Sequence, residues 1–569
     1  MADWDQSVDF LVVGSGAGAL ASAVRAKDLG LETLVVEKAE VYGGSSAMSG
    51  GVCWVGNNRY LGKYGIKDSD QEVLDYLKAI TKGEVDEKFL IAYRDHSKRM
   101  TDYFHEKTRL TFDALDQYTD YYPESPGGKM GGRSMEPDPF DGSELGEDFA
   151  LLRRPATSAL ILGKFMITAR IAKRMIMLDF LALMQMAWFL LLYFFRAPKR
   201  ARTGGRDPYL TNGNALIARL RMSLKDRNVP LWLSTSAKEL VTENGRVVGA
   251  VVERGGKLVR IEARHGVMLA AGGFERNLEM REKYGPKPAS TEWTAGAETN
   301  TGDGITMGQT LGAAVGLMDE AWWTPTTQFP GVKSGWVLVV EKSLPGGIFI
   351  NRNGERFTNE AAPYVDVVVN MYEDQKKTGN TVPGWMVFDA RYRHNYIAGP
   401  VGPGKAMPDS TLPRKVRTQM LVKADTVEEL ATKLSVPVDR LSATISRYNT
   451  MSLKGVDEDF GRGNSASDRY YGDDRVKPNP CMAPLAKAPY YAIPLFPGDL
   501  GTKGGLKTDT DSKVVREDGS VIDGLYAAGN TSQSIMGRTY PGAGGTIGPA
   551  MCFGFLGAEA AAREAGKPV

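Results

Sequence analysis

The sequence has few of the residues that build disulfide and metal sites. It contains three cysteines and four histidines in 569 residues. Cys53, Cys481 and Cys552 are far apart and form no CxxC pair, so neither a disulfide framework nor a thiolate zinc site is expected, and a reducing compartment fits. No two histidines stand at metal-ligand spacing, and we therefore expect no bound metal.

Strong charge of either sign is also missing. The formal net charge is +2, whereas a nucleic-acid-binding protein normally presents a basic face or stripe, so we expect no nucleic-acid partner. The N-terminus lacks a basic segment ahead of an apolar core, so no signal peptide is expected. Hydrophobic residues make up 42% and charged residues 24%, the balance of an ordered globular protein. A chain of this length predicts at least two domains.

The first forty residues carry a glycine motif in its full context. The apolar run Phe10–Val13 predicts a buried strand, and it leads into Gly14-Ser15-Gly16-Ala17-Gly18-Ala19 and a helical segment that ends before Gly30. A second apolar run, Thr33–Val36, ends at Glu37. This order of a strand, a glycine turn, a helix, a second strand and an acidic residue is that of the dinucleotide-binding βαβ unit. In such a unit the helix N-terminus binds a pyrophosphate, and the acidic residue accepts hydrogen bonds from a ribose. Gly402-Pro403-Gly404 has no strand before it and is interpreted as a loop.

The segment after Glu37 indicates whether the bound dinucleotide carries a nicotinamide or a flavin. Val41–Gly51 forms a loop rich in glycine and serine, which a nicotinamide enzyme does not need at this place. With a TGDG sequence at Thr301–Gly304 and a late strand that ends in Gly529-Asn530, the arrangement resembles the fumarate reductase and succinate dehydrogenase flavoprotein superfamily. The resemblance implies bound FAD. No histidine occurs in Ser45–Ser49, where covalently flavinylated relatives carry one, so non-covalent binding is expected. No second strand-supported GxGxxG exists, so bound NAD(P)H is not expected.

The same resemblance implies which residues contact the cofactor. They are Gly14, Gly16, Ala17, Gly18, Glu37, Lys38, Gly43, Gly44, Ser45, Ser46, Ser49, Gly50, Gly51, Ala237, Ala271, Gly272, Asn300, Gly302, Asp303, Gly529, Asn530, Gly545, Thr546 and Ile547. Gly545 to Ile547 open a final helix, whose N-terminus would stabilise negative charge on the reduced flavin.

The residues before that helix indicate the chemistry. Fumarate reductases place a dicarboxylate-binding arginine ahead of the final glycine turn, whereas this chain has Tyr540 there, four residues before Gly544. Together with Tyr118–Gly128 and Arg356–Tyr364, this pattern resembles the 3-ketosteroid Δ1-dehydrogenases. The implied reaction removes a proton from carbon 2 and a hydride from carbon 1 of a 3-ketosteroid, and passes the hydride to flavin N5.

The resemblance also implies the roles of the site residues. Tyr540 and the Gly544 amide would bind the 3-keto oxygen as an oxyanion hole, and Tyr364 as phenolate would be the base. Tyr121 would hydrogen-bond to Tyr364 and lower its pKa, although Tyr118 and Tyr122 compete for that role; Tyr118 would otherwise line the substrate. Trp322, Trp323 and Phe329 fit a steroid pocket or core packing equally well.

One segment has no counterpart in compact soluble members of the family. Met175–Phe195 is apolar enough to span a bilayer and is flanked by basic residues. Because the same FAD domain continues on both sides of it, we expect an insertion at residues 151–205 that enters one leaflet from the side. A dimer interface or a buried core helix is the alternative. The segment resembles membrane-associated cholest-4-en-3-one Δ1-dehydrogenases, which implies a cytoplasmic protein attached peripherally to the inner face of the cell membrane.

The expected fold class is α/β. Residues 1–323 and 502–569 would form a Rossmann-like FAD-binding domain, and residues 324–501 an inserted α+β domain that caps the substrate. A quinone or a redox protein would take the electrons. The rival functions are a 3-oxo-5α-steroid 4-dehydrogenase or another fumarate-reductase-like ene-reductase, and a non-catalytic membrane protein that retains FAD.

Overall fold

The computed structural model describes residues 3–161, 163–176 and 180–569. Its central sheet is built from short apolar strands in the order β22-β23-β13-β2-β3-β9. All neighbours are parallel except β22 and β23. Such a sheet is buried on both faces, which explains why Phe10, Leu11 and Val12 are fully buried. The strands are β2 Phe10–Val13, β3 Thr33–Val36, β9 Leu231–Trp232, β13 Val267–Leu269, β22 Lys513–Val515 and β23 Val521–Ala527.

Helices cover this sheet, and a second sheet lies beside it. Glycine and alanine along α1 let it pack closely on α18: a Cβ added at Gly18 would lie 2.6 Å from the Ala550 carbonyl oxygen. The second sheet has the order β1-β12-β11-β10. The helices of this half are α1 Ala17–Asp28, α2 Gly44–Met48, α3 Asp70–Thr81, α4 Glu87–Lys107, α9 Asn212–Asp226, α10 Leu278–Tyr284, α11 Asp303–Thr310 and α18 Ile547–Glu564. The second-sheet strands are β1 Gln6–Val8, β10 Thr235–Glu243, β11 Arg246–Arg254 and β12 Lys257–Ala263.

The middle of the chain forms a separate antiparallel sheet. Its order is β16-β15-β20-β18-β17, and β19 also pairs with β20. The expected domain limits, 323/324 and 501/502, fall inside β15 and near the end of β20, so these two paired strands join the halves. The strands are β15 Ala321–Gln328, β16 Gly335–Val337, β17 Gly347–Ile350, β18 Gly384–Asp389, β19 Val422–Ala424 and β20 Tyr490–Thr502; the helices are α12 Tyr364–Thr378, α13 Ala390–Asn395, α14 Arg414–Gln419, α15 Val427–Leu434, α16 Val438–Lys454 and α17 Ala466–Tyr470.

Short strand pairs connect the remaining segments. One small sheet has the order β4-β6-β5 and lies next to the start of α18, and β14 pairs with β21. The bounds are β4 Cys53–Trp54, β5 Phe112–Ala114, β6 Ser134–Pro137, β14 Val315–Gly316 and β21 Gly505–Leu506.

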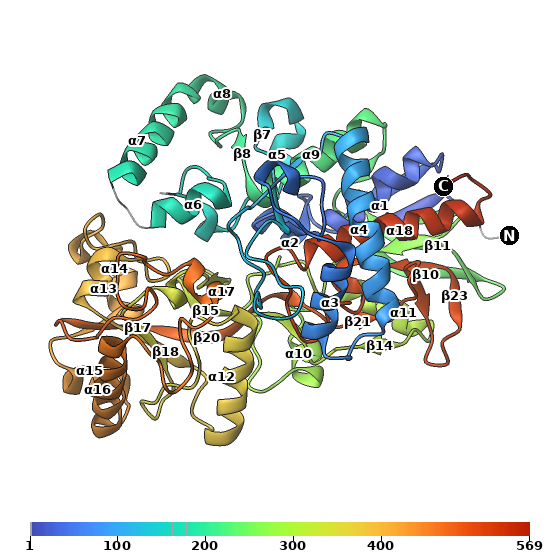
Figure 1. The fold of residues 1–569 in the computed structure, drawn as a ribbon. Helices are drawn as coiled ribbons and strands as arrows, with labels where there is room; N and C mark the ends of the chain where they lie inside the picture. Colours follow the sequence, from blue (N-terminus) through green and yellow to red (C-terminus); the bar gives the residue numbers. More distant parts are fainter. Residues whose placement is uncertain (1–2, 162, 177–179) are drawn as a thin grey trace.

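The apolar insertion projects from one edge of the molecule as α6, α7 and α8 (Figure 1). It is framed by β7 Phe140–Asp141 and β8 Tyr209–Leu210, which pair with each other. The helices are α5 Asp148–Leu151, α6 Ala169–Ile176, α7 Phe180–Phe195 and α8 Ala197–Arg202. Within the described residues, no helix combines the length and the apolar character that crossing a membrane requires. Part of the apolar run, residues 177–179, lies outside the described residues.

Candidate active site

Three tyrosines from distant parts of the chain meet in one cluster. Tyr121 lies in the loop after β5, Tyr364 is the first residue of α12, and Tyr540 precedes α18. The three ring centroids lie 5.3 to 5.4 Å apart in every pairing. All three side chains are buried, at 3 to 7% exposure. The sequence-predicted catalytic tyrosines therefore share one site.

The hydroxyl contacts distinguish the tyrosines that compete for the role beside Tyr364. Tyr121 donates to the Tyr364 oxygen at 2.9 Å. The hydroxyl of Tyr118 accepts from Tyr471 at 3.2 Å, and Tyr122 donates to Asp366 at 3.0 Å. In this structure Tyr121 is thus the direct hydrogen-bond partner of Tyr364.

Burial sets the electrostatics of these phenols. It raises the pKa of Tyr364 and that of Tyr121 well above 10, and the pKa of Tyr540 also rises. The hydrogen bond from Tyr121 acts in the opposite direction on Tyr364, because it stabilises the phenolate. Tyr364 is also the first residue of a 15-residue helix, and the positive end of the helix dipole favours an anion there.

The turn before α18 is held in a conformation that only glycine adopts easily. Gly544 has φ +96°, and a Cβ there would lie 2.5 Å from the backbone nitrogen of Trp54. The Gly544 carbonyl accepts from that nitrogen at 3.1 Å. Among the described residues, the Gly544 N–H has no acceptor within hydrogen-bonding distance. The Tyr540 hydroxyl forms a hydrogen bond with Thr546 Oγ1 at 2.9 Å. This turn therefore offers one free backbone donor close to one phenol.

Sequence reasoning missed the groups that support the cluster. Trp54 Nε1 donates to Asp120 at 2.8 Å, and Arg133 donates to the same carboxylate at 2.9 Å. Burial raises the pKa of Asp120 to about 6. This network fixes the residue next to Tyr121 and the strand that faces Gly544. No local pattern reveals it, because its members are separated by many residues and meet only in the fold.

The predicted cofactor residues converge at the carboxyl ends of β2 and β3. Gly14 has φ +110°, and a Cβ on it would lie 2.2 Å from the Ala270 carbonyl oxygen. Gly16 is the N-cap residue of α1 and has no side chain, and the first turn carries no acidic residue, which suits an anion. Glu37 accepts from Ser15 Oγ at 2.5 Å and from the Ala39 N–H at 2.8 Å.

Side-chain contacts join the other predicted cofactor segments to this end of the sheet. Ser45 Oγ accepts from Asn300 Nδ2 at 3.0 Å, and Lys38 binds Asp303 at 2.7 Å. Ser46 Oγ accepts from the Ala17 N–H at 3.1 Å. Gly43 and Gly44 follow β3, Ser49 to Gly51 follow α2, Ala271 and Gly272 follow β13, Gly302 caps α11, and Gly529 with Asn530 follows β23, as expected. Ala237 lies within β10. A glycine N-cap, a first turn without acidic residues and glycines at close backbone approaches fit the pyrophosphate of FAD.

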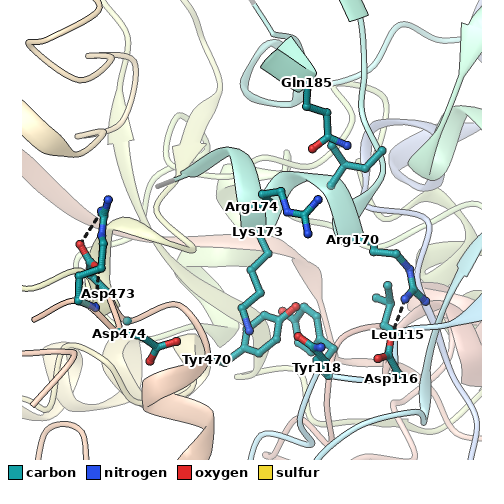
Figure 2. Close-up of a pocket in the computed structure, with 14 residues that line it drawn as sticks. Leu115, Asp116, Tyr118, Arg170, Lys173, Arg174, Gln185, Tyr470, Asp473 and Asp474 are labelled. Atoms are coloured by element: carbon teal, nitrogen blue, oxygen red, sulfur yellow. Dashed lines mark hydrogen bonds and ion pairs between the residues drawn. The ribbon is translucent and has the colours of Figure 1, made fainter. Parts of the chain in front are cut away.

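Two cavities lie next to the tyrosines. A small one is lined by Tyr121, Tyr364, Lys342, Tyr118 and Tyr470. A larger one of about 590 Å³ lies between α6 and the 115–118 and 470–475 loops and shares Tyr118 and Tyr470 with it. Figure 2 shows the Lys173 side chain reaching toward Tyr470, 4.0 Å from the ring centre, and Arg170 paired with Asp116. The Trp322 and Tyr540 rings meet edge to face, with their centroids 4.8 Å apart. Trp323 packs against Tyr372 instead, and Phe329 packs against Trp336.

Comparisons with known proteins agree with this arrangement. The family described as "FAD binding domain" matches residues 9–547. A 3-oxosteroid 1-dehydrogenase of Mycobacterium tuberculosis is 44% identical over 99% of both chains, and one of Comamonas testosteroni is 36% identical over 99% of this chain and 98% of its own.

A solved structure is similar over nearly its whole length. The 3-ketosteroid Δ1-dehydrogenase of Sterolibacterium denitrificans, determined in complex with 1,4-androstadiene-3,17-dione, has a TM-score of 0.95 and 45% identity, covering 98% of this chain and all of that one. The chain therefore belongs to the FAD-binding flavoprotein family that includes the 3-oxosteroid 1-dehydrogenases.

Proposed function

We propose that the protein is an FAD-dependent 3-oxosteroid 1-dehydrogenase. The observation that carries the proposal is the buried cluster of Tyr121, Tyr364 and Tyr540 beside the Gly544 turn, in a chain 44% identical over its full length to enzymes of that name. In the part of the chain that the structure describes, no guanidinium stands in this cluster to clamp a dicarboxylate: Arg538 is paired instead with Asp319 and Glu320. A substrate with a single carbonyl fits these donors better.

The residues divide the reaction between them. The Tyr540 hydroxyl and the Gly544 N–H donate to the 3-keto oxygen, which acidifies the hydrogens on carbon 2. Tyr364 as phenolate takes one of those protons, and Tyr121 holds the Tyr364 oxygen by its hydrogen bond. FAD, when bound, supplies the acceptor for the hydride of carbon 1. The three tyrosines are buried away from water, which strengthens each of these polar contacts.

A steady-state assay with an artificial electron acceptor tests this function. The purified yellow protein should convert androst-4-ene-3,17-dione to the 1,4-diene-3-one, identified by loss of two hydrogens and by the position of the new double bond. Conversion only of a saturated 5α-steroid to the 4-ene would support the rival 4-dehydrogenase. Steroid binding without any turnover would support a non-catalytic FAD protein.

We further propose that sterols with a side chain are accepted and that the insertion rests on a membrane surface. The exposed apolar side chains of α7 are 45 to 75% accessible: Phe180, Leu181, Leu183, Met184, Trp188, Leu191, Phe194 and Phe195. The next helix, α8, is cationic and would lie at lipid headgroups. The cavity of Figure 2 lies between this insertion and the tyrosines and is large enough for a side chain.

Vesicle sedimentation tests the membrane contact. Wild-type protein should pellet with vesicles that contain anionic lipid, and Trp188→Glu with Phe194→Glu should reduce the pelleted fraction, because two exposed apolar contacts become charged. Leu258→Glu is the matched control, since Leu258 is 67% exposed on β12, away from the insertion. Equal pelleting of the insertion variant and the control would contradict membrane attachment through α7.

A further inference from the structure

Two buried lysines border the tyrosine cluster and have no part in the chemistry above. Lys342 is 5% exposed and Lys503 is fully buried. Among the described residues, no carboxylate lies within 4.0 Å of either ammonium. Because burying a charge without a paired countercharge costs free energy, these two positions call for an explanation.

Lys342 binds the chain just before the base. Its Nζ donates to the carbonyl oxygens of Ala361 at 2.9 Å and Ala362 at 2.5 Å. Those residues precede Tyr364 by three and two positions. Pro363, which follows them, is the N-cap residue of α12 and provides no side-chain cap. Lys342 and Tyr364 also line the same small cavity. The ammonium thus fixes the segment from which the Tyr364 side chain departs.

Lys503 does the same for the other reacting tyrosine. Its Nζ donates to the carbonyl oxygen of Thr539, the residue before Tyr540, at 2.7 Å. It also lies 4.7 Å from the ring centre of Trp322, and that indole contacts the Tyr540 ring. Two unrelated segments therefore place a lysine on the backbone immediately ahead of a reacting phenol.

The charged surroundings leave both lysines cationic near neutral pH. Burial lowers the pKa of each to about 8. The titratable and charged groups that face Lys342 are Asp468, Asp366, Cys481 and Arg462, and those that face Lys503 are Glu320, Asp366, Arg538 and Glu84. Asp366 faces both, and burial raises its pKa to about 6.

We propose that Lys342 and Lys503 are the positioning residues of the tyrosine site. Each holds the backbone before one reacting tyrosine, and their positive charges offset the negative charge that passes from the Tyr364 phenolate to the steroid enolate at Tyr540. The inference rests on the proposed function and adds to it two residues that act through the backbone ahead of Tyr364 and Tyr540.

Substitutions of Lys342 in the FAD-loaded protein separate its two contributions. Lys342→Met removes both the donor and the charge, and kcat should fall roughly tenfold or more with KM changed less than about threefold. The rise of kcat/KM with pH should move to higher pH by roughly one pH unit. Lys342→Gln keeps an N–H donor without the charge, so it should recover part of kcat but not the position of the pH profile.

The matched control removes a lysine from the far end of α12, the helix that begins at Tyr364. Lys376→Met, exposed in the last turn of α12, should leave kcat and the pH profile unchanged. The proposal is overturned if folded Lys342→Met keeps wild-type kcat and pH dependence. It is also overturned if Lys342→Gln restores both fully, because the charge would then have no role.

A binding measurement tests Lys503 without turnover. A steroid with a phenolic A ring mimics the enolate, and ultraviolet absorbance reports the fraction of bound probe that is ionised at each pH. Lys503→Met should bind the probe with its ionisation moved to higher pH, whereas unchanged ionisation would overturn the role of Lys503. Wild-type protein that ionises the probe but dehydrogenates no steroid would refute the proposed function and leave the lysine inference standing.

Discussion

At the residue scale, the account rests on three phenols with different partners. Tyr364 accepts a hydrogen bond from Tyr121, and the Tyr540 hydroxyl forms a hydrogen bond with Thr546. The resemblance to the 3-ketosteroid Δ1-dehydrogenases implied Tyr121, Tyr364 and Tyr540, and the structure brings their rings together. The choice of Tyr121 over Tyr118 as the partner of Tyr364 was not predictable, since both residues lie in one loop and only the fold decides which hydroxyl faces Tyr364.

Removal of the base hydroxyl should abolish most activity. Tyr364→Phe keeps the ring and its packing, so FAD content should stay at the wild-type level while kcat falls about 100- to 10,000-fold. Stopped-flow and steady-state assays measure the loss. Tyr490→Phe at the start of β20 is the control and should retain activity. A Tyr364→Phe enzyme within twofold of wild type would rule out this base.

The pH dependence follows from the burial of Tyr364. Burial raises the pKa of this phenol, so it is mainly protonated near neutrality and a larger fraction becomes the active phenolate as pH rises. From pH 6 to about pH 7.5, where Lys342 and Lys503 with a pKa of about 8 remain cationic, kcat/KM should therefore increase with pH. A flat profile, or a decrease over this range in enzyme that remains folded, would mean that another group is the base.

At the scale of elements, the glycine motif and the apolar runs predicted β2 and β3 correctly. Helix α1 begins at Ala17, three residues before the apolar pattern starts. The sequence did not show this start because Ala17, Gly18 and Ala19 carry no apolar periodicity. The pairing of β15 with β20 was not predictable, since it joins segments separated by more than 150 residues. The supporting lysines were missed for the same reason.

The Gly544 turn provides a test of backbone geometry. Gly544→Ala would place a Cβ 2.5 Å from the Trp54 nitrogen and must displace the turn that carries the free N–H. Activity should fall at least tenfold. Gly519→Ala is the matched control: Gly519 has φ +81° but nothing within 4 Å, so it should lose roughly 1 kcal/mol of stability and keep its activity. Equal activities of the two variants would contradict the role of this turn.

At the scale of the whole molecule, buried acids link stability to pH. Glu341 is 3% exposed, and burial raises its pKa from 4.5 to about 7. The folded state then holds this proton more tightly than the unfolded state, so Glu341 lowers stability as pH rises from about 4.5 to about 7, by up to about 3 kcal/mol.

Neutralising this acid should change the pH dependence of thermal unfolding. Glu341→Gln should raise Tm relative to wild type at pH 8 more than at pH 5, because the wild type loses stability at this carboxyl as the pH rises from about 4.5 to about 7. Glu458→Gln on the exposed surface serves as the control. The same Tm difference at both pH values would show that folding does not raise the pKa of Glu341.

The most direct test of the central claim is an anaerobic single turnover. Wild-type holoprotein mixed with androst-4-ene-3,17-dione should lose its oxidised flavin absorbance and form one equivalent of the 1,4-diene-3-one. Tyr364→Phe should bind the steroid but lose the absorbance at least about 100-fold more slowly. If Tyr364→Phe reacts at the wild-type rate, or if wild-type protein that holds FAD leaves the steroid unchanged, the tyrosine site does not perform the reaction proposed for it.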